Sequence, residues 1–223
     1  MRSIIATCVA AIALAAAAPL AAAKSPDTWD GLHRVQVQGR AVVYLLPGAD
    51  FRGYSKVMIA PPEVAFEKNW QRNLRGPDRL NDREIQQVRD SASRLLSESL
   101  SKAYAKAGYQ VVGESGPDVL LVRPGLANLQ FVVPQQSARS FTISEDAGEA
   151  TLVLEVRDSV AGSLLGRALD SEVAGGGIPV IRNESTLRAD FEYLFDDWAK
   201  RIAAGMGRLK ANSPIDADGR RMK

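Results

Sequence analysis

The sequence predicts an α+β fold, namely a two-layer sandwich with a mostly antiparallel sheet and two long amphipathic helices packed on one face. Three observations predict it: a strand–turn–strand pattern over residues 148–173, and helical repeats over residues 81–108 and 185–206. Each helix has one apolar face that must be covered, and one face of an antiparallel sheet can cover both. We expect a single domain over residues 40–209 to hold all three segments.

The strand–turn–strand pattern begins with apolar residues at every second position. These residues are Ala150, Leu152, Leu154 and Val156, and the positions between them hold Thr151, Val153, Glu155 and Arg157. A period of two is what a half-buried strand requires. Asp158 and Gly162 then bound a turn, because an aspartate can hydrogen-bond the following backbone and a glycine can adopt positive φ. Residues 164–173 return as the second strand, so we expect a β-hairpin at the centre of the sheet.

The first 23 residues have the pattern of a secretory signal peptide. Arg2 gives the positive start, an apolar run begins at Ile4, and small residues end at Ala23. This pattern predicts cleavage after Ala23, export, and a periplasmic location. The run is long enough to serve alternatively as an uncleaved anchor, although alanine contributes little to membrane insertion. Removing 23 of 223 residues leaves 200, enough for one domain with a well-formed core.

Cys8 is the only cysteine and lies within the predicted signal peptide. Thr7 precedes it where lipid attachment requires a small residue, and an apolar run follows it. We therefore expect no outer-membrane lipid anchoring through Cys8.

The mature chain would have no cysteine, and His33 is its only histidine. These counts exclude thiolate chemistry, disulfides and zinc sites built from His and Cys, and they leave one possible base for a Ser–His arrangement. A carboxylate-only magnesium or calcium site stays open, although no D-x-D-x-D-G loop is present. We predict no metal and no cofactor.

The charges nearly balance, with 28 basic and 26 acidic residues. No block of lysine or arginine marks a nucleic-acid groove, so we expect no nucleic-acid partner. Residues 210–223 are polar and are predicted to form a disordered tail. The basic cluster at its end suggests, as an alternative, peripheral contact with anionic lipid at a membrane surface.

Residues 24–39 lie between the signal peptide and the domain and are predicted to be a polar leader. Trp29 and Leu32 are its expected anchoring contacts. Short strands are expected at residues 40–46, 56–60, 109–112, 118–123 and 126–133. The second of these should end at Pro61, because proline cannot donate a hydrogen bond to a strand ladder.

Residues 63–70 place Phe66 and Trp70 among charged residues. The simpler interpretation is that both aromatic rings face the core, from a second strand or a lid. The alternative is contact with a partner or a ligand, and Phe66 and Trp70 are our only candidates for such a contact.

The first helix is predicted to begin at Asn81, with Glu84 three residues later completing a capping-box pattern. Gly108 stands at the expected C-cap position. Between them, apolar residues recur at spacings of three and four: Ile85, Val88, Ala92, Leu95, Leu96, Leu100, Ala103, Tyr104 and Ala107.

A second helix is predicted after the hairpin, with Ser185 or Thr186 as its cap. Its apolar face consists of Leu187, Phe191, Leu194, Phe195, Trp198, Ile202 and Met206. Before the hairpin, residues 134–143 are expected to be a polar connection. After it, Gly175–Gly177 is expected to end the second strand as a flexible link, because the phosphate-loop pattern G-x-x-x-x-G-K-[ST] is absent.

Four stretches carry a resemblance to a known family: residues 47–66, 106–123, 147–170 and 195–201. Together they resemble a bacterial family of envelope lipoproteins defined by a domain of unknown function, number 3313. The likeness covers roughly residues 45–209, and the hairpin is its most specific part. Many members carry a lipid-attachment motif, from which this sequence departs. The resemblance implies no established activity and no catalytic residues.

Two function classes remain. The first is a non-catalytic periplasmic or cell-envelope binding or accessory protein, whose partner is an envelope protein or a small ligand. The alternative is an envelope hydrolase or transferase that uses serine with lysine, or carboxylates. The sequence leaves the oligomeric state open.

Few residues support the enzyme alternative, and we predict no catalytic residue. Ser99 and Lys102 fit the pattern S-x-x-K, but the companion S-D-N and K-T-G elements are absent. On a helix these two residues are simply polar neighbours one turn apart. Two pairs of carboxylates are adjacent in the sequence, Glu145 with Asp146 and Asp196 with Asp197. We interpret both pairs as solvent-exposed surface residues.

Overall fold

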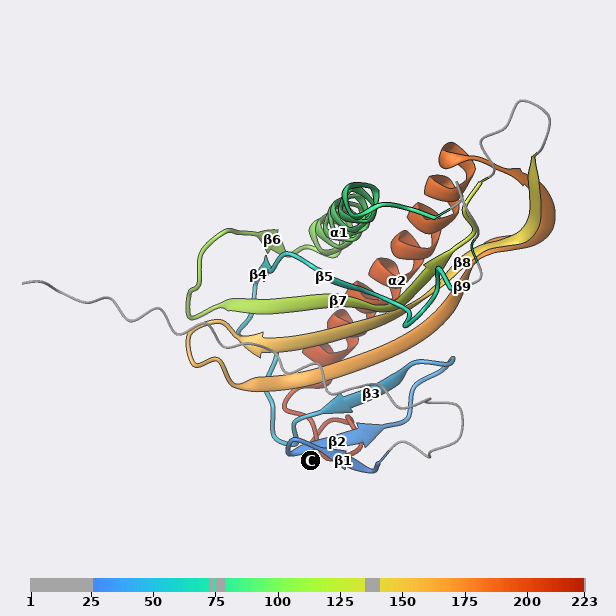
Figure 1. The fold of residues 1–223 in the computed structure, drawn as a ribbon. Helices are drawn as coiled ribbons and strands as arrows, with labels where there is room; N and C mark the ends of the chain where they lie inside the picture. Colours follow the sequence, from blue (N-terminus) through green and yellow to red (C-terminus); the bar gives the residue numbers. More distant parts are fainter. Residues whose placement is uncertain (1–25, 73, 75–78, 135–140, 223) are drawn as a thin grey trace, which may run out of the picture.

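The computed structural model describes residues 26–72, 74, 79–134 and 141–222 (Figure 1). Within these residues the chain is a mixed α+β structure with one sheet of nine strands and two helices. The predicted signal peptide and Cys8 lie outside the described residues. The strands are β1 (Thr28–Trp29), β2 (Leu32–Val35), β3 (Val42–Leu45), β4 (Lys56–Ile59), β5 (Glu63–Phe66), β6 (Gln110–Val111), β7 (Val119–Phe131), β8 (Thr142–Asp158) and β9 (Leu164–Arg182). The helices are α1 (Asp82–Lys106) and α2 (Glu184–Asn212).

The strands follow the order β1-β2-β3-β9-β8-β7-β4-β6, and β5 pairs with β7 beyond the end of β4. Most pairs are antiparallel, as the sequence predicts. The pairs β4–β6, β4–β7 and β5–β7 are parallel instead. α1 links β5 to β6 and so returns the chain in the direction in which β4 runs, which antiparallel hairpins cannot do.

The predicted hairpin forms the centre of the sheet, where β8 and β9 run side by side (Figure 1). Its turn is the expected one. The Oδ1 atom of Asp158 accepts hydrogen bonds from the backbone N–H groups of Val160 and Ala161, at 2.9 and 2.7 Å. Gly162 has a φ of 69°, a conformation that a residue with a Cβ rarely adopts. The polar end of the predicted strand therefore folds back on itself by local hydrogen bonding.

The glycine triplet does not end the second strand as predicted, because β9 continues through it to Arg182. The register between β8 and β9 shifts here, so the triplet is a bulge within the ladder. At Gly175, with a φ of 127°, an added Cβ would lie 2.8 Å from the carbonyl oxygen of Glu145. The glycine is needed for this close approach of two backbones, rather than for a flexible link.

α1 begins as the sequence predicts. The Asn81 side chain accepts hydrogen bonds from the N–H groups of Arg83 and Glu84, and the Glu84 carboxylate accepts one from the Asn81 N–H. Ala107 is the C-cap, and Gly108 follows it with a φ of 89°. A left-handed glycine directly after the C-cap is a common way to end a helix.

α2 is capped two or three residues earlier than predicted, by Asn183 rather than by Ser185 or Thr186. The Asn183 side chain accepts a hydrogen bond from the Thr186 N–H at 2.9 Å, and the Thr186 hydroxyl accepts one from the Asn183 N–H at 3.0 Å. Thr186 therefore supplies the second half of the capping box. Asparagine is among the strongest caps, so the helix begins at the first residue that can cap it.

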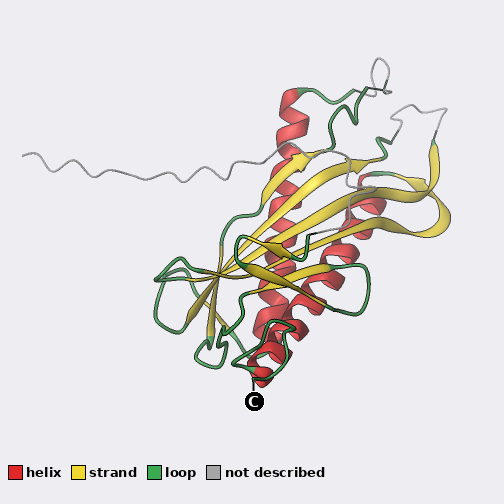
Figure 2. Ribbon diagram, turned by 90° about the horizontal axis from the view of Figure 1, so that it is seen from below, coloured by secondary structure: helices red, strands yellow, loops and turns green. Residues whose placement is uncertain are grey.

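Both helices lie on the same side of the strands in Figure 2, and they contact each other along their length. Their apolar faces supply buried Leu96, Leu100 and Trp198 to a core that also includes Leu126 and Leu152 of the sheet. Even-numbered residues from 120 to 126 on β7 and from 150 to 156 on β8 face this core, because side chains alternate along a strand. Odd-numbered residues between them therefore lie on the outer face of the sheet.

The segment predicted as a leader contributes two strands instead. β1 and β2 pair with each other, β2 pairs with β3, and the side chain of Leu32 is 0 % exposed. Leu32 is the expected anchor, but the backbone around it also joins the sheet. The polar residues that suggested a leader are exposed or half-buried, while Leu32 and Val35 at the two ends of β2 are buried.

The segment predicted as a disordered tail is ordered over residues 213–222. Ile215 is 0 % exposed, its N–H donates to the Ala49 carbonyl at 3.1 Å, and its carbonyl accepts from Gly48 at 2.8 Å. The Ser213 hydroxyl accepts a hydrogen bond from the Phe51 N–H at 2.9 Å. The turn-rich segment at residues 47–51 has buried backbone groups that need partners, and the C-terminal segment supplies them.

We predict that Ile215→Ala lowers the free energy of unfolding by about 2–4 kcal/mol, because it removes a fully buried side chain and leaves a cavity. Met222→Ala is the control, since Met222 is half-exposed in the same segment and should change stability by about 0.5 kcal/mol or less. Urea denaturation measures both. Equal effects of the two substitutions would show that the C-terminal segment does not pack.

Candidate functional site

The predicted contact residues Phe66 and Trp70 lie together with Phe131 at the end of β5. The rings of Phe66 and Trp70 are stacked with centroids 5.5 Å apart, and those of Trp70 and Phe131 are 4.7 Å apart. The Arg89 guanidinium from α1 lies 5.8 Å from the Phe66 ring centroid. All three rings are half-buried, so packing accounts for their position. Contact of Phe66 or Trp70 with a partner or ligand stays a prediction.

A row of charged residues crosses the outer face of the sheet. Strand pairing places Arg123 of β7 opposite Glu155 of β8, Glu155 opposite Arg167 of β9, and Arg167 opposite Tyr44 of β3. Directly opposed residues of neighbouring strands share a face and lie close enough to interact. The sheet therefore assembles a site from four strands that are far apart in the sequence.

Glu155 is held by two arginines, one on each carboxylate oxygen. Arg167 donates to Oε1 from Nε at 3.2 Å and from Nη2 at 2.6 Å. Arg157 donates to Oε2 from Nε at 3.0 Å and from Nη2 at 2.9 Å. Burial by itself would raise the pKa of Glu155, but the hydrogen bonds and charges of Arg167 and Arg157 outweigh it and lower the pKa below its usual 4.5.

Arg167 connects this carboxylate to the N-terminal strands. Its side chain is only 9 % exposed, and its Nη1 donates to Oδ2 of Asp30 at 3.0 Å. The guanidinium lies 3.9 Å from the centroid of the Trp29 ring, which packs edge-on against Tyr44. Stacking and two ion pairs fix this arginine in one orientation.

Arg123 is the member of the row that has no partner. Its side chain is half-buried but makes no hydrogen bond and no ion pair with any described residue. The neighbouring Glu155 already receives four hydrogen bonds from the other two arginines. Arg123 therefore presents a positive charge that the sheet itself does not neutralise.

Arg123 lines a cavity of about 370 Å³ on the outer face, between β5, β7 and β8. Glu63 and Glu155 are its other charged lining residues, and Val64, Pro124 and Val153 are among the apolar ones. A concave site with apolar walls and a few fixed polar groups is the usual form of a small-ligand pocket. We take this outer-face cavity as the candidate binding site.

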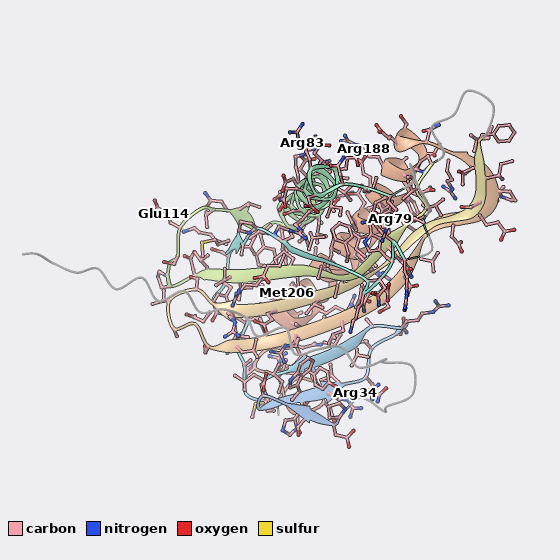
Figure 3. All side chains as sticks on the ribbon, viewed as in Figure 1. Arg34, Arg79, Arg83, Glu114, Arg188 and Met206 are labelled. Atoms are coloured by element: carbon pink, nitrogen blue, oxygen red, sulfur yellow. The ribbon has the colours of Figure 1, made fainter. Side chains whose placement is uncertain are left out.

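A larger hollow of about 550 Å³ lies beside the loop that leads into β7, next to Lys56, Glu114 and Asp118. Lys56 and Asp118 are already paired at 3.2 Å. Figure 3 shows Glu114 at the left edge of the molecule. The charged side chains at this hollow are either paired with each other or exposed to solvent, so we give the hollow no role in binding.

The serine and lysine of the enzyme alternative do not form a pair. Ser99 is 3 % exposed and donates a hydrogen bond to Oδ1 of Asp196 on α2 at 2.6 Å, whereas Lys102 is exposed. A buried serine held by a carboxylate between two helices is not placed to attack a substrate. The bond instead joins α1 to α2.

The other carboxylates are also accounted for. Asp197 lies 3.3 Å from Arg201, which also pairs with buried Asp170 of β9 at 3.1 Å. Burial raises the pKa of Asp170, and the charge of Arg201 partly opposes this effect. Glu145 and Asp146 are exposed on β8. In the described part of the chain, no group of three or more His, Cys, Asp or Glu side chains is arranged to hold a metal ion.

Sequence reasoning missed the outer-face site. The period of two in the hairpin places Glu155 and Arg157 away from the apolar side, which is the only signal that the sequence carries. Arg123 gives no such signal, because its neighbours follow from strand pairing alone. Among the described residues, no helix has the length and hydropathy to cross a membrane.

The family model of a protein of unknown function, DUF3313, matches residues 22–202. The chain belongs to the DUF3313 family. The resemblance seen in the hairpin and its flanking segments is therefore confirmed. No curated protein matches this DUF3313 chain.

Several solved structures have a weak likeness to this DUF3313 protein. The PelC dodecamer from Paraburkholderia phytofirmans is 13% identical, with a TM-score of 0.38, and the match covers 73% of this chain and 97% of that one. A minor lipoprotein from Acinetobacter baumannii is 12% identical, with a TM-score of 0.36 and coverage of 71% and 94%. A DUF330 protein from Xanthomonas campestris is 8% identical, with a TM-score of 0.38 and coverage of 75% and 91%.

We predict that Glu155→Gln lowers the free energy of unfolding at pH 7 by about 2 kcal/mol, because it removes two charge-assisted contacts. The pKa of Glu155 is below 4.5 in the folded state, so its stabilising effect is complete above pH 4.5. It is lost as the pH falls through the folded-state pKa. The gap in stability between wild type and variant should therefore shrink below pH 4.5.

Urea denaturation at a series of pH values measures this gap. Glu114→Gln is the control, because Glu114 is exposed and should change stability little at any pH. A gap for Glu155→Gln that stays constant between pH 7 and acid pH would contradict the role of the Glu155 charge.

Proposed function

We propose that this DUF3313 protein is an exported, non-catalytic binding or accessory protein of the cell envelope. The observation that carries the proposal is the outer-face cavity, where half-buried Arg123 has no partner among the described residues. A cation that the fold neither neutralises nor fully exposes is suited to a ligand group of opposite charge.

Rigidity of the surroundings supports this proposal. Arg123 and Glu155 stand on two strands in the middle of the sheet, and Glu155 is fixed by Arg157 and Arg167. Sites on strands hold their side chains more precisely than sites on mobile loops, because packing and backbone pairing limit their motion. The cavity is thus prepared for binding without a conformational change.

The architecture also supports a role for the outer face. We propose the two-layer arrangement that the sequence predicts, with both helices on one face of the sheet. The helices then cover the inner face, and the middle of the outer face stays available to a ligand or partner. The buried Ser99, which bonds to Asp196, gives no comparable support to the hydrolase or transferase alternative.

Export belongs to the proposal as well. The signal-peptide pattern predicts cleavage after Ala23 and release into the periplasm, and Cys8 is then removed with the signal. The partner would be an envelope protein or a small ligand, with peripheral contact at a membrane as one way to meet it. Nucleic acid is not expected.

Site-specific photo-crosslinking in living cells tests this proposal. A photoreactive residue at Ala127, which lines the cavity on β7, should give one dominant envelope-derived adduct. The control position is Tyr193, which is 76 % exposed on α2 and should give no such adduct. Adding Arg123→Gln should weaken the Ala127 adduct. Equal adducts at both positions, or none at Ala127, would overturn the accessory role toward an envelope component.

Mass measurement of the same protein tests export. Processing after Ala23 predicts a mature chain that begins at Lys24 and is recovered in the periplasmic fraction. An intact N-terminus on cytoplasmic protein would contradict export.

A further inference from the structure

The outer-face cavity holds a negative side chain as well as a positive one. Glu63 of β5 pairs in register with Gly125 of β7, two residues from Arg123. Paired residues of neighbouring strands share a face, and so do residues two apart on one strand. Glu63 and Arg123 therefore both point to the outer face, from two neighbouring strands.

These two opposite charges do not pair with each other. No ion pair within 4 Å joins them, and the side chain of Glu63, like that of Arg123, makes no hydrogen bond with any described residue. Glu155 differs, because both of its oxygens are occupied by Arg157 and Arg167. The cavity therefore has one available cation and one available anion on its walls, set apart from each other.

The surface between these charges is apolar. Pro61 comes from the segment between β4 and β5, and Val153 comes from β8. At Gly125 an added Cβ would lie 3.5 Å from the Glu63 carbonyl oxygen and 3.8 Å from that of Val153. Because glycine has no side chain, the space between the two charged groups stays open.

We propose that this cavity binds a short zwitterion, a small molecule with one amine and one acidic group joined by a few carbon atoms. The inference rests on the binding role proposed above and names the class of ligand. The amine would lie against the Glu63 carboxylate, the acidic group against the Arg123 guanidinium, and the apolar part against Val153 and Pro61. A volume of about 370 Å³ is at the small end of ligand pockets and suits such a molecule.

Charge complementarity selects a zwitterion over a simple ion. An anion alone would be attracted by Arg123 but repelled by Glu63. A cation alone would be attracted by Glu63 but repelled by Arg123. A zwitterion gives a partner to both half-buried Arg123 and exposed Glu63, and it meets no like charge on either wall. The same chemistry occurs in a free amino acid and in a phosphoethanolamine headgroup.

NMR titration of the mature protein tests the proposal with matched probes. L-leucine carries both charges, 4-methylpentanoate has no amine, and 3-methylbutylamine has no carboxylate. The backbone amide signals of Gly125 and Val153 report binding in the cavity. We expect L-leucine to bind at least about tenfold more tightly than either analogue, because each analogue leaves one charged side chain unpaired.

O-phosphoethanolamine is the second zwitterion probe and separates the two sources. Tighter binding of O-phosphoethanolamine than of L-leucine would identify a headgroup-type ligand, and the reverse would identify an amino-acid-type ligand. Either order supports a zwitterion site. Equal affinity for L-leucine and a singly charged analogue would overturn it, as would the failure of both zwitterions to bind up to about 10 mM.

Variants connect the affinity to the two side chains. Glu63→Gln and Arg123→Gln should each weaken the better zwitterion by about tenfold. Arg83→Gln and Glu114→Gln are charge-matched controls at exposed positions away from the cavity, and they should leave the affinity unchanged (Figure 3). Thermal unfolding of all four variants confirms that they fold. Unchanged affinity in folded Glu63→Gln would overturn the inference.

The two proposals fail in different experiments. If no zwitterion binds while the Ala127 crosslink persists and depends on Arg123, the cavity takes a ligand of other chemistry and only the zwitterion inference is wrong. If the Ala127 crosslink is absent while L-leucine binds in the cavity, the accessory role toward an envelope component is wrong.

Discussion

The pairing of β8 with β9 is the constraint on which the rest of the structure depends. These strands have 17 and 19 residues, and every other strand connects to the sheet through them. β7 and β4–β6 attach on the β8 side, and β1–β3 attach on the β9 side. The turn at Asp158 and Gly162 sets the register of the pair, so it also decides which residues of β7 and β3 fall in the same row across the sheet.

Close approaches of the backbone limit which residues this ladder can contain. At Gly148 an added Cβ would lie 2.2 Å from the Gln130 carbonyl oxygen and 2.9 Å from the Phe191 ring. Gly175 is similarly enclosed by Glu145 and its neighbours on β8. Both glycines lie where the register shifts, and there the ladder accommodates extra residues by a local interruption of its regular pairing.

The two faces of the central strands serve different purposes because side chains alternate. Even-numbered residues from 120 to 126 on β7 and from 150 to 156 on β8 are apolar and face the core, while the odd-numbered residues beside them include Arg123, Glu155 and Arg157. On the outer face, Glu155 is neutralised by two arginines, and Arg167 also holds Trp29 and Asp30. Within the described part of the chain, the side chains that remain without a partner at the cavity are Arg123 on one wall and Glu63 on another. Some charged residues of the outer face, such as Glu155 and Arg167, therefore stabilise the sheet, while their neighbours Arg123 and Glu63 are available to a ligand.

The sequence by itself determined the features that depend on neighbouring residues. The capping box at Asn81, the turn at Asp158 and the apolar face of each helix are local patterns, because hydrogen bonds and side-chain periodicity act over a few positions. Only the tertiary structure decided the features that depend on contacts between residues far apart in the sequence. Leu32 and Ile215 lie in polar segments that look like a leader and a tail, yet each is buried by residues elsewhere in the chain. The outer-face cavity is of the same kind, since strand register, rather than any motif, brings Glu63 of β5 beside Arg123 of β7.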